Sequence, residues 1–330
     1  MVKPGDVLYA LYGATSGEVA VSRQKGAINQ AILAILPRDD CDARYITAWL
    51  RKQKGYIVTT YLQGGQGNLS GVIVKNLEVF IPSLPEQQKI GFMLSHLDSL
   101  ITLHQRKYDK LCVLKKSMLD KMFPKGGSLY PEIRFAGFTD PWEQRKLGDV
   151  ARRVTRKNEN RDSDLPLTIS AQYGLVDQRT FFNNQVASKD MSGYFLLHKG
   201  EFAYNKSTST DSPWGAIKRL EKYDMGCVST LYICFELLSG DPDFLVTYYE
   251  TDRWYKAVQL IAAEGARNHG LLNIAPDDFF ETQICIPKRI DEQRQIGAFF
   301  DRLDSLITLH QRKLELLRNI KKSMLDKMFV

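Results

Sequence analysis

The string LDSLITLHQRK occupies residues 97–107 and occurs again, unchanged, at residues 303–313. A second string is duplicated at the same offset of 206 residues: KKSMLDKMF stands at 115–123 and at 321–329. Over the 38 residues that begin at Glu86 and at Glu292, 25 positions are identical without a gap. Self-similarity of this extent is an internal duplication, and it sets the organisation of the whole chain.

Each copy of the duplicated segment predicts one long helix. Glu-Gln opens both copies, which suits the first turn of a helix, and neither copy contains Gly or Pro from Phe92 to Phe123 or from Ala298 onward. About 36 residues at 1.5 Å per residue give helices of about 50 Å. Apolar residues recur with the 4-3 spacing of a heptad, so we expect the two helices to pack on each other. The positions expected to make this contact are Leu97, Ile101, Leu111 and Met118 in the first helix and Leu303, Ile307, Leu317 and Met324 in the second.

Four polar residues interrupt these heptad positions: His104 and Lys115 in the first copy, His310 and Lys321 in the second. Two explanations are open. The histidines could contribute to a metal site, or all four could be polar residues that set the register of the helices or extend their charged ends to solvent. We favour the second explanation and predict no metal site and no cofactor.

The segments before the two helices are weakly related as well. KPGDVLY at residues 3–9 resembles HKGEFAY at residues 198–204, each as a turn that enters a strand. Asn68-Leu69-Ser70 with Ile81-Pro82 matches Asn273-Ile274-Ala275 with Ile286-Pro287 at the same internal interval. The predicted organisation is domain, long helix, domain, long helix, with boundaries at 1–84, 85–125, 126–290 and 291–330.

The two predicted domains differ in length. Nothing in the first domain corresponds to residues 131–197 of the second. We therefore expect a first domain that is partial and truncated at its N-terminus, ahead of Met1.

Local patterns predict mixed α and β structure in both domains, hence an α+β fold class. Runs rich in β-branched and aromatic residues predict strands at Asp6–Leu11, Ala31–Leu36, Val79–Pro82, Glu201–Tyr204, Leu231–Glu236 and Gln283–Pro287. Helical patterns cover Ala43–Gly55 and Asp243–Ala263, and a glycine-containing loop follows each of them.

Composition narrows the class of protein. Apolar residues make up 44% and charged residues 25% of the 330 residues, as in a globular domain. No run of about 18 apolar residues and no signal-peptide pattern occurs, which predicts a cytoplasmic protein without a membrane segment. The five cysteines include no C-x-x-C pair, so zinc and redox sites are not expected. The net charge of +7 favours an acidic partner.

Basic residues concentrate at the start of the second domain. Seven lysines and arginines between Arg145 and Arg161 face only Asp149 and Glu159 in sequence, which is typical of a nucleic-acid-binding patch, although a solvated charged face is an equal alternative. The candidates for phosphate contact are Arg152, Arg153, Arg156 and Lys157.

Polar loops supply candidates for reading bases. Arg suits guanine and Asn suits adenine, and an ordinary polar loop is the alternative. The candidates are Lys206, Ser207 and Thr208 after a predicted strand, Arg267, Asn268 and His269 in the second glycine-containing loop, Gln63, Gln66 and Asn68 in the first, and, more weakly, Tyr173 and Arg179. Asn68 and Asn273 could instead cap the turns that follow them.

Signatures of a self-contained enzyme are missing from the sequence. There is no G-x-x-x-x-G-K-[ST] loop, no H-E-x-x-H and no G-x-S-x-G. Gly65-Gln66-Gly67-Asn68-Leu69-Ser70 nearly matches a dinucleotide loop but ends in Ser and follows a helix, so we regard it as coincidence. We predict that the chain has no catalytic site.

The combined features resemble the specificity subunits of Type I restriction-modification enzymes. The resemblance rests on a long helix that ends in KKSMLDKMFP (115–124), a second domain that opens with PEIRFAGFTDPWEQRKLGDV (131–150), the second long helix, and the turn and Ile-Pro motifs given above. It covers the whole chain.

This resemblance implies two target-recognition domains that each read half of an interrupted site in double-stranded DNA. It also implies that the long helices pair as an antiparallel coiled coil and set the spacing between the half-sites. Methyltransferase subunits would dock on this scaffold, restriction-translocase subunits would join them, and two copies could associate through the long helices. An alternative is a silent or truncated scaffold that binds methyltransferase subunits without specific DNA recognition.

Overall fold

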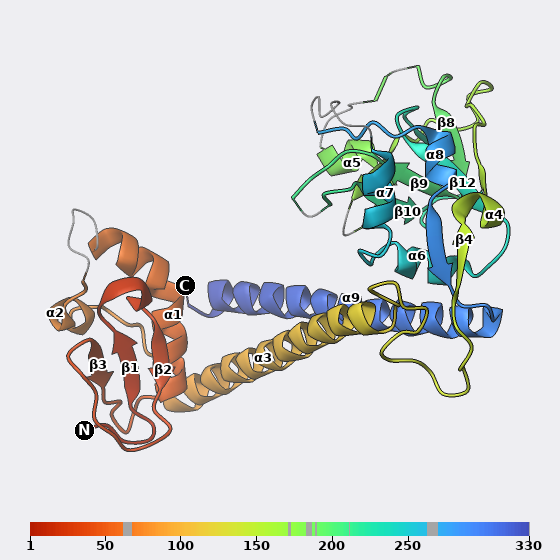
Figure 1. Cartoon of the computed structure of the whole chain (residues 1–330). Coiled ribbons are helices and arrows are strands. Elements are labelled where there is room, and N and C mark those ends of the chain that lie inside the picture. Colours follow the sequence, from red (N-terminus) through yellow and green to blue (C-terminus); the bar gives the residue numbers. More distant parts are fainter. Residues whose placement is uncertain are drawn as a thin grey trace. The chain divides into compact units, whose positions relative to one another are not determined.

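The computed structural model describes residues 1–61, 68–170, 173–182, 187–188, 190–210, 212–262 and 270–329. Two compact units divide the chain (Figure 1). Unit 1 comprises residues 1–110 and 307–330, and unit 2 comprises residues 111–306. Each unit therefore contains one half of each long helix.

The two long helices predicted from the duplication are present. Helix α3 covers Leu84–Lys121 with 38 residues, and helix α9 covers Ile290–Met328 with 39 residues. At 1.5 Å per residue, each is about 57 Å long. The end of α3 lies a few residues before that of the predicted segment 85–125, because Pro124 disfavours helical backbone at the residue before it.

The helices pair antiparallel, as expected. In unit 1, Lys321 donates to Asp98 at 2.5 Å and Arg318 donates to Gln105 at 3.0 Å, so the beginning of α3 lies along the end of α9. In unit 2, Lys115 donates to Asp304 at 2.6 Å. The eight predicted contact positions are all buried or half-buried: Leu97, Ile101, Leu111, Met118, Leu303, Ile307, Leu317 and Met324. The predicted fold class, α+β with an antiparallel pair of long helices, is confirmed.

The two histidines at heptad positions of α3 and α9 face each other. Nδ1 of His104 lies 2.8 Å from Nδ1 of His310, so one of these nitrogens must carry the hydrogen and the other must accept it. Burial and the charge of the facing His104 lower the pKa of His310. Within the described ranges, no cluster of three or more His, Cys, Asp or Glu residues could hold a metal ion.

Unit 1 is built on a three-stranded antiparallel sheet in the order β2-β1-β3. Its elements are β1 (Val7–Ala10), the short helix η1 (Gly13–Thr15), β2 (Val19–Val21), β3 (Ile32–Ile35), α1 (Ala43–Tyr61) and α2 (Gly71–Lys75). Val7 and Tyr9 alternate inward and pack against Trp49 and Ile57 of α1. Phe329, which follows α9, completes this core with its ring 5.1 Å from that of Tyr45.

Unit 2 has a larger core around the four-stranded sheet β10-β9-β12-β5, with two-stranded sheets β11-β8, β13-β4 and β6-β7. Its strands are β4 (Glu143–Lys146), β5 (Ala151–Arg153), β6 (Leu167–Ser170), β7 (Gly174–Asp177), β8 (Phe195–His198), β9 (Phe202–Asn205), β10 (Ala216–Arg219), β11 (Met225–Val228), β12 (Ile233–Leu237) and β13 (Gln283–Ile286). Its short helices are α4 (Leu147–Val150), α5 (Gln178–Phe182), α6 (Pro242–Tyr248), α7 (Tyr255–Ile261) and α8 (Pro276–Phe280).

The same arrangement of β-strands and helix recurs in the two units. Strands β1, β2 and β3 with α1 correspond to β9, β10 and β12 with α6. The turns of KPGDVLY and HKGEFAY are closed in the same way, since the N–H groups of Lys3 and His198 donate to the carboxylates of Asp6 and Glu201. The weak sequence likeness therefore reflects a common local structure.

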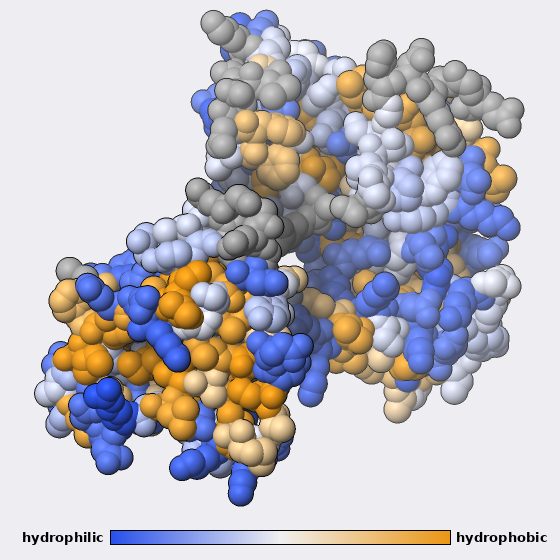
Figure 2. Space-filling model, turned by 90° about the vertical axis from the view of Figure 1, so that its left-hand side faces the viewer, coloured by the Kyte–Doolittle hydropathy of each residue, from blue (hydrophilic) through white to orange (hydrophobic). Residues whose placement is uncertain are grey.

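One face of the sheet differs between the units. In unit 2, Ala203 of β9 and Cys234 of β12 are buried in a second cluster with residues of β8 and β11. The residues at the corresponding places in unit 1, Leu8 and Ala34, are only half-buried. Figure 2 shows apolar residues gathered on the face of unit 1 that is turned to the viewer. Counterparts of β4 to β8 do not occur among the described residues of unit 1.

Two predicted elements are wrong. Val79–Pro82 is not a strand; instead, the Tyr45 hydroxyl donates to the Phe80 carbonyl at 2.7 Å, which occupies an acceptor that a strand partner would use. The helix predicted at Asp243–Ala263 is two helices, α6 and α7. The Thr251 hydroxyl donates to the Tyr248 carbonyl and Trp254 Nε1 donates to the Tyr249 carbonyl, and side-chain bonds of this kind compete with helical ones.

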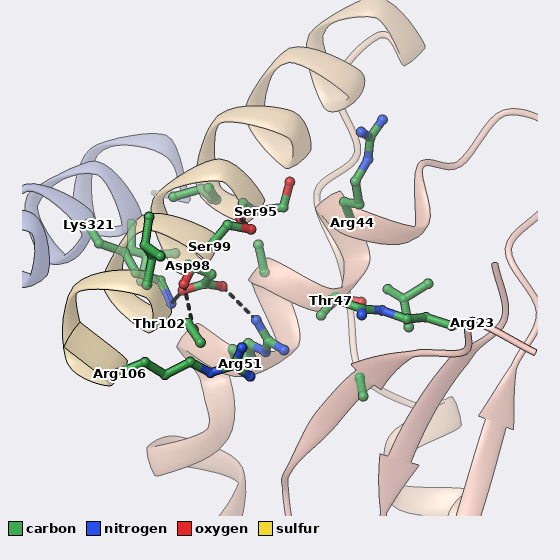
Figure 3. A pocket seen from close by; sticks show the side chains of 16 residues that line it. Arg23, Arg44, Thr47, Arg51, Ser95, Asp98, Ser99, Thr102, Arg106 and Lys321 are labelled. Carbon is green, nitrogen blue, oxygen red and sulfur yellow. Dashed lines mark hydrogen bonds and ion pairs between the residues drawn. The ribbon is translucent and has the colours of Figure 1, made fainter. Parts of the chain in front are cut away.

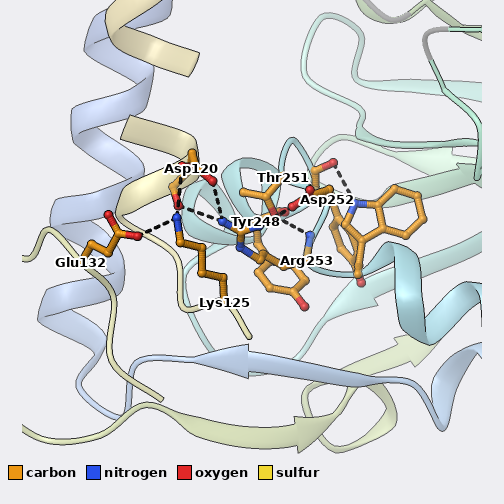
Figure 4. Close-up of polar contacts among 9 residues, drawn as sticks. Asp120, Lys125, Glu132, Tyr248, Thr251, Asp252 and Arg253 are labelled. Atoms are coloured by element: carbon orange, nitrogen blue, oxygen red, sulfur yellow. Dashed lines mark hydrogen bonds and ion pairs between the residues drawn. The ribbon is translucent and has the colours of Figure 1, made fainter. Parts of the chain in front are cut away.

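The break between α6 and α7 has a structural role. It presents Arg253, which donates to the carbonyl of Asp120 at 2.8 Å and to its carboxylate at 3.2 Å (Figure 4). Lys125 lies 3.3 Å from the same carboxylate. Hydrogen bonds from Arg253 and Lys125 lower the pKa of Asp120. The last turn of α3 is thereby tied to the body of unit 2.

A glycine in each long helix permits close packing. A Cβ at Gly297 would lie 2.7 Å from Cβ of Asp243 and 2.8 Å from N of Phe244, and a Cβ at Gly91 would lie 2.9 Å from N of Tyr45. We expect Gly297→Ala to destabilise unit 2 by about 1 to 3 kcal/mol, because the methyl group forces α6 away from α9.

Thermal and urea unfolding of the variant would measure this loss. Gly55→Ala is the matched control: it also replaces a helical glycine, but no atom lies within 4 Å of the added Cβ, so helix propensity should stabilise it slightly. Equal stability changes in the two variants would contradict the packing explanation.

Candidate nucleic-acid interface

The basic side chains at the start of unit 2 pair with carboxylates from distant segments, which the sequence did not indicate. Arg152 on β5 lies 2.5 Å from Glu236 of the neighbouring strand β12, and its side chain is 68% exposed. Arg153 lies 3.7 Å from Asp277 on α8. Exposed ion pairs of this kind contribute only about 0 to 1 kcal/mol. Both arginines can therefore exchange their carboxylate for a phosphate at small cost.

Arg156 and Lys157 are held more firmly. Arg156 donates to both carboxylate oxygens of Glu201 at 2.8 Å, and Glu201 is 8% exposed. Lys157 lies 4.0 Å above the ring of Phe195 and donates to the carbonyl of Gly193. Arg156 neutralises a buried carboxylate, so its prediction as a phosphate contact is weakened.

We expect Arg156→Ala to reduce the stability of unit 2 by about 1 to 2 kcal/mol, because it leaves the buried Glu201 carboxylate without its charged partner. Arg152→Ala, which removes an equal charge from an exposed pair, should change stability by less than about 0.5 kcal/mol. Urea unfolding at neutral pH compares the two variants. Equal losses would mean that Glu201 finds another donor.

The polar loop after β9 pairs with another segment that the sequence singled out. Leu272 N donates to the carbonyl of Lys206, Ser207 forms an isolated bridge with Leu271, and both the backbone N–H and the hydroxyl of Thr208 donate to the carbonyl of Gly270. The structure thus brings residues 206–208 beside residues 270–272. Residues 206–208 are predicted positions, whereas 270–272 only follow the predicted positions Arg267, Asn268 and His269, which lie outside the described residues.

A cavity of about 320 Å³ lies at this junction and is lined by Thr208, Ser209, Pro213, Trp214, Gly270, Leu271 and Leu272. The Nζ atom of Lys206 lies 3.3 Å from the carbonyl of Ile274, and burial lowers the pKa of Lys206. Sequence analysis missed Trp214 and Pro213, because they follow the polar loop by several residues and show no pattern of their own.

The remaining candidates stand apart. Tyr173, in the turn between β6 and β7, is 53% exposed and lies below Lys222, whose Nζ is 5.5 Å from the ring centroid. Arg179 on α5 is bound by the carboxylate of Asp177, and the hydrogen bonds from Arg179 lower the pKa of Asp177. Neither residue is in the surface formed by 206–208 and 270–272.

Several candidates fall outside the described residues: Gln63, Gln66, Arg267, Asn268 and His269. Asn68 is described and exposed, and it forms a backbone bridge with Tyr12. Its alternative role as a cap is wrong, because Ser70 is the N-cap of α2 and accepts from Ile73 N at 3.3 Å. Asn273 does not cap α8 either, since the N-cap there is Ala275.

Part of the chain matches a known family. Residues 2–112 match the family described as "Type I restriction modification DNA specificity domain". No helix in the portion that the structure describes is long and apolar enough to cross a membrane.

Two relatives from Methanocaldococcus jannaschii are similar over part of their length. The Type I restriction enzyme MjaVIII specificity subunit is 24% identical over 154 residues, which cover 46% of this chain and 36% of the relative. The MjaIX specificity subunit is 26% identical over 193 residues, covering 53% of this chain and 44% of the relative. The chain thus matches less than half the length of these relatives.

A solved structure shares the fold. The Type I restriction-modification system S subunit from M. genitalium superposes with a TM-score of 0.58 at 15% sequence identity, covering 100% of this chain and 84% of that one. At this identity, the likeness concerns the fold alone.

Proposed function

Because residues 2–112 match the Type I restriction modification DNA specificity domain family, we propose that the chain is the DNA-recognition subunit of a Type I restriction-modification enzyme. The observation that carries the proposal is the recurrence of one sheet-and-helix arrangement in two units that share a pair of antiparallel helices. Two related reading units on one scaffold suit a DNA site with two separate halves.

The proposal also assigns DNA recognition and catalysis to different subunits. The chain recognises DNA, whereas methyltransferase subunits and restriction-translocase subunits that assemble with it perform catalysis. Association of two copies through the long helices, and a cytoplasmic location in contact with cellular DNA, are also part of it. The four segments 1–84, 85–125, 126–290 and 291–330 are its proposed recognition domains and spacers.

In unit 2, the surface around 206–208 and 270–272 is the proposed site of base contact, with Arg152 and Arg153 on β5 as phosphate contacts. The base-contact surface and the phosphate contacts are joined through one short segment. Arg153 pairs with Asp277, and Lys206 donates to the carbonyl of Ile274, which lies three residues before Asp277. Phosphate contacts position a protein on DNA, and base-edge contacts specify the sequence.

Two substitutions should separate these roles. Arg153→Ala should weaken binding to all duplexes alike and reduce the slope of log K against log salt by about 1, since one phosphate contact is lost. Arg267→Ala should relax the preference at one base position, at a cost of about 1 to 3 kcal/mol for the preferred base. Fluorescence anisotropy with a set of single-base variants of the methylated site measures both. Uniform weakening in both variants would contradict base reading by Arg267.

The decisive experiment is co-expression with the cognate methyltransferase subunits, followed by single-molecule sequencing of the methylated DNA. A bipartite or palindromic methylated motif is the expected result. A stable complex that leaves no motif would replace the proposal with the silent-scaffold alternative.

A further inference from the structure

Unit 1 contains a basic cavity that plays no part in the proposed recognition surface. Its volume is about 700 Å³, and it lies among β2, α1, α3 and the end of α9 (Figure 3). Among the described residues, five cationic side chains and a single carboxylate, Asp98, line it; the cations are Arg23, Arg44, Arg51, Arg106 and Lys321.

The charges of this cavity are not balanced. Asp98 accepts from Arg51 at 2.7 Å and from Lys321 at 2.5 Å, and Arg44 lies 3.1 Å from Asp42. Arg23 and Arg106 have no acidic partner within the described residues. Figure 3 shows Arg51 and Arg106 extending toward the same region beside Asp98, where two guanidinium groups repel each other unless an anion lies between them.

The corresponding place in unit 2 is balanced by the chain itself. By the duplication, Asp304 and Lys115 correspond to Asp98 and Lys321. The N–H groups of Asp42 and Asp241 both donate to a buried glutamine of the long helix, at 3.0 and 2.8 Å, and this shared bond aligns α1 with α6.

The alignment reverses two charges. Arg51 of α1 corresponds to Glu250, which lies 2.7 Å from Lys115. Arg44 of α1 corresponds to Asp243, which lies 2.6 Å from Arg219. In unit 2, therefore, carboxylates of the protein occupy places where unit 1 has arginines.

Strand register explains why unit 1 is hollow here. Val7 pairs with Val21 and Leu8 with Ala20, as Phe202 pairs with Arg219 and Ala203 with Lys218. Ala20 and Val21 thus stand where unit 2 has two long basic side chains that fill space and pair with the carboxylates. Unit 1 therefore lacks the long side chains that fill this space in unit 2, and it has Arg44 and Arg51 in place of the carboxylates of Asp243 and Glu250.

We propose that this cavity binds a polyanion that carries phosphate groups. Guanidinium groups bind phosphate oxygens in pairs, and the Thr47 hydroxyl, which is buried without a hydrogen-bond partner among the described residues, lines the same space. Ser95, Ser99 and Thr102 line it too, but their hydroxyls donate to backbone carbonyls of α3. A volume of about 700 Å³ suits a chain of several phosphates, since ligand pockets range over about 300 to 1,000 Å³. No aromatic or amide side chain is among the described residues that line the cavity, so these residues recognise phosphate charge and not the nucleobase.

The probe for this site is inorganic tripolyphosphate, titrated calorimetrically into the full chain at low salt. We expect saturable binding of one equivalent. The double variant Arg23→Gln/Arg106→Gln should weaken it at least tenfold, and folding should be retained because neither arginine has an acidic partner to lose. The control Lys75→Gln/Lys89→Gln removes the same charge from exposed positions of unit 1 outside the cavity and should leave binding unchanged.

Competition identifies the source of the phosphates. Displacement of the probe by a random-sequence DNA duplex would assign the cavity to the nucleic-acid backbone, and displacement by ATP and GTP with equal strength, but not by duplex, would assign it to free nucleotides. Equal weakening in the double variant and its control would overturn the proposal, as would tighter binding of hexaglutamate than of tripolyphosphate. The proposal does not rest on recognition of a specific DNA sequence, so its failure leaves the methylation experiment unaffected.

Discussion

Arg134→Ala is expected to lower the unfolding free energy of unit 2 by about 3 to 5 kcal/mol. Arg134 donates to both oxygens of Glu292, at 2.7 and 2.8 Å, and Trp142 Nε1 donates to the same carboxylate at 3.2 Å. Glu292 is 1% exposed in the first turn of α9. Removing the arginine leaves a buried charge with one neutral donor, and removal of one partner of a buried ion pair is far costlier than loss of a surface pair.

Hydrogen exchange followed by mass spectrometry measures this loss separately for peptides of each unit. Exchange should accelerate in peptides of unit 2 and remain unchanged in peptides of unit 1 such as those of β1. The duplication supplies a matched control, because Glu86 stands at the place of Glu292 in the other copy and is exposed. Glu86→Ala should cost less than about 0.5 kcal/mol. A comparable loss in both variants would show that the ion pair is not the cause.

Phe123→Ala is expected to cost unit 2 about 3 to 5 kcal/mol, through lost burial and the cavity left behind. Phe123 is 1% exposed, and its ring centroid lies 5.8 Å from those of Trp142 and Phe244 and 6.2 Å from that of Phe300. The aromatic side chain that ends one copy of KKSMLDKMF therefore joins the start of α9 to the body of the unit.

Urea unfolding followed by tryptophan fluorescence reports this change, because Trp142 and Trp254 lie in the same core. Phe92→Ala is the control, since Phe92 is 60% exposed on α3, and its stability change should stay within about 0.5 kcal/mol. Phe329→Ala should instead destabilise unit 1, where Phe329 is 7% exposed. Loss of stability in unit 2 from Phe329→Ala would contradict the assignment of each helix end to its core.

The long helices and their seam were predictable from the amino-acid order alone. A heptad is a local pattern. Its two copies, at an offset of 206 residues, predict both the length of each helix and the side of the helix that is buried. The strands β1, β3, β9, β12 and β13 were predictable for the same reason, within one or two residues at their ends. The short strand β5 was missed because its exposed arginines hide the alternation.

Contacts between distant residues decided the rest. The side-chain bonds of Thr251 and Trp254 interrupt the predicted helix Asp243–Ala263, and the break allows Arg253 to bind Asp120, 133 residues away in the sequence. The basic patch is partly neutralised because Glu201 and Glu236, 45 and 84 residues after their arginine partners, come within 3 Å of them. The basic cavity of unit 1 gathers five cations of the described residues from three helices and the segment that follows β2, and none of them belongs to the basic run predicted to bind nucleic acid. Local spacing fixes which face of a helix is buried, whereas the charge of a surface is a sum over segments that only folding brings together.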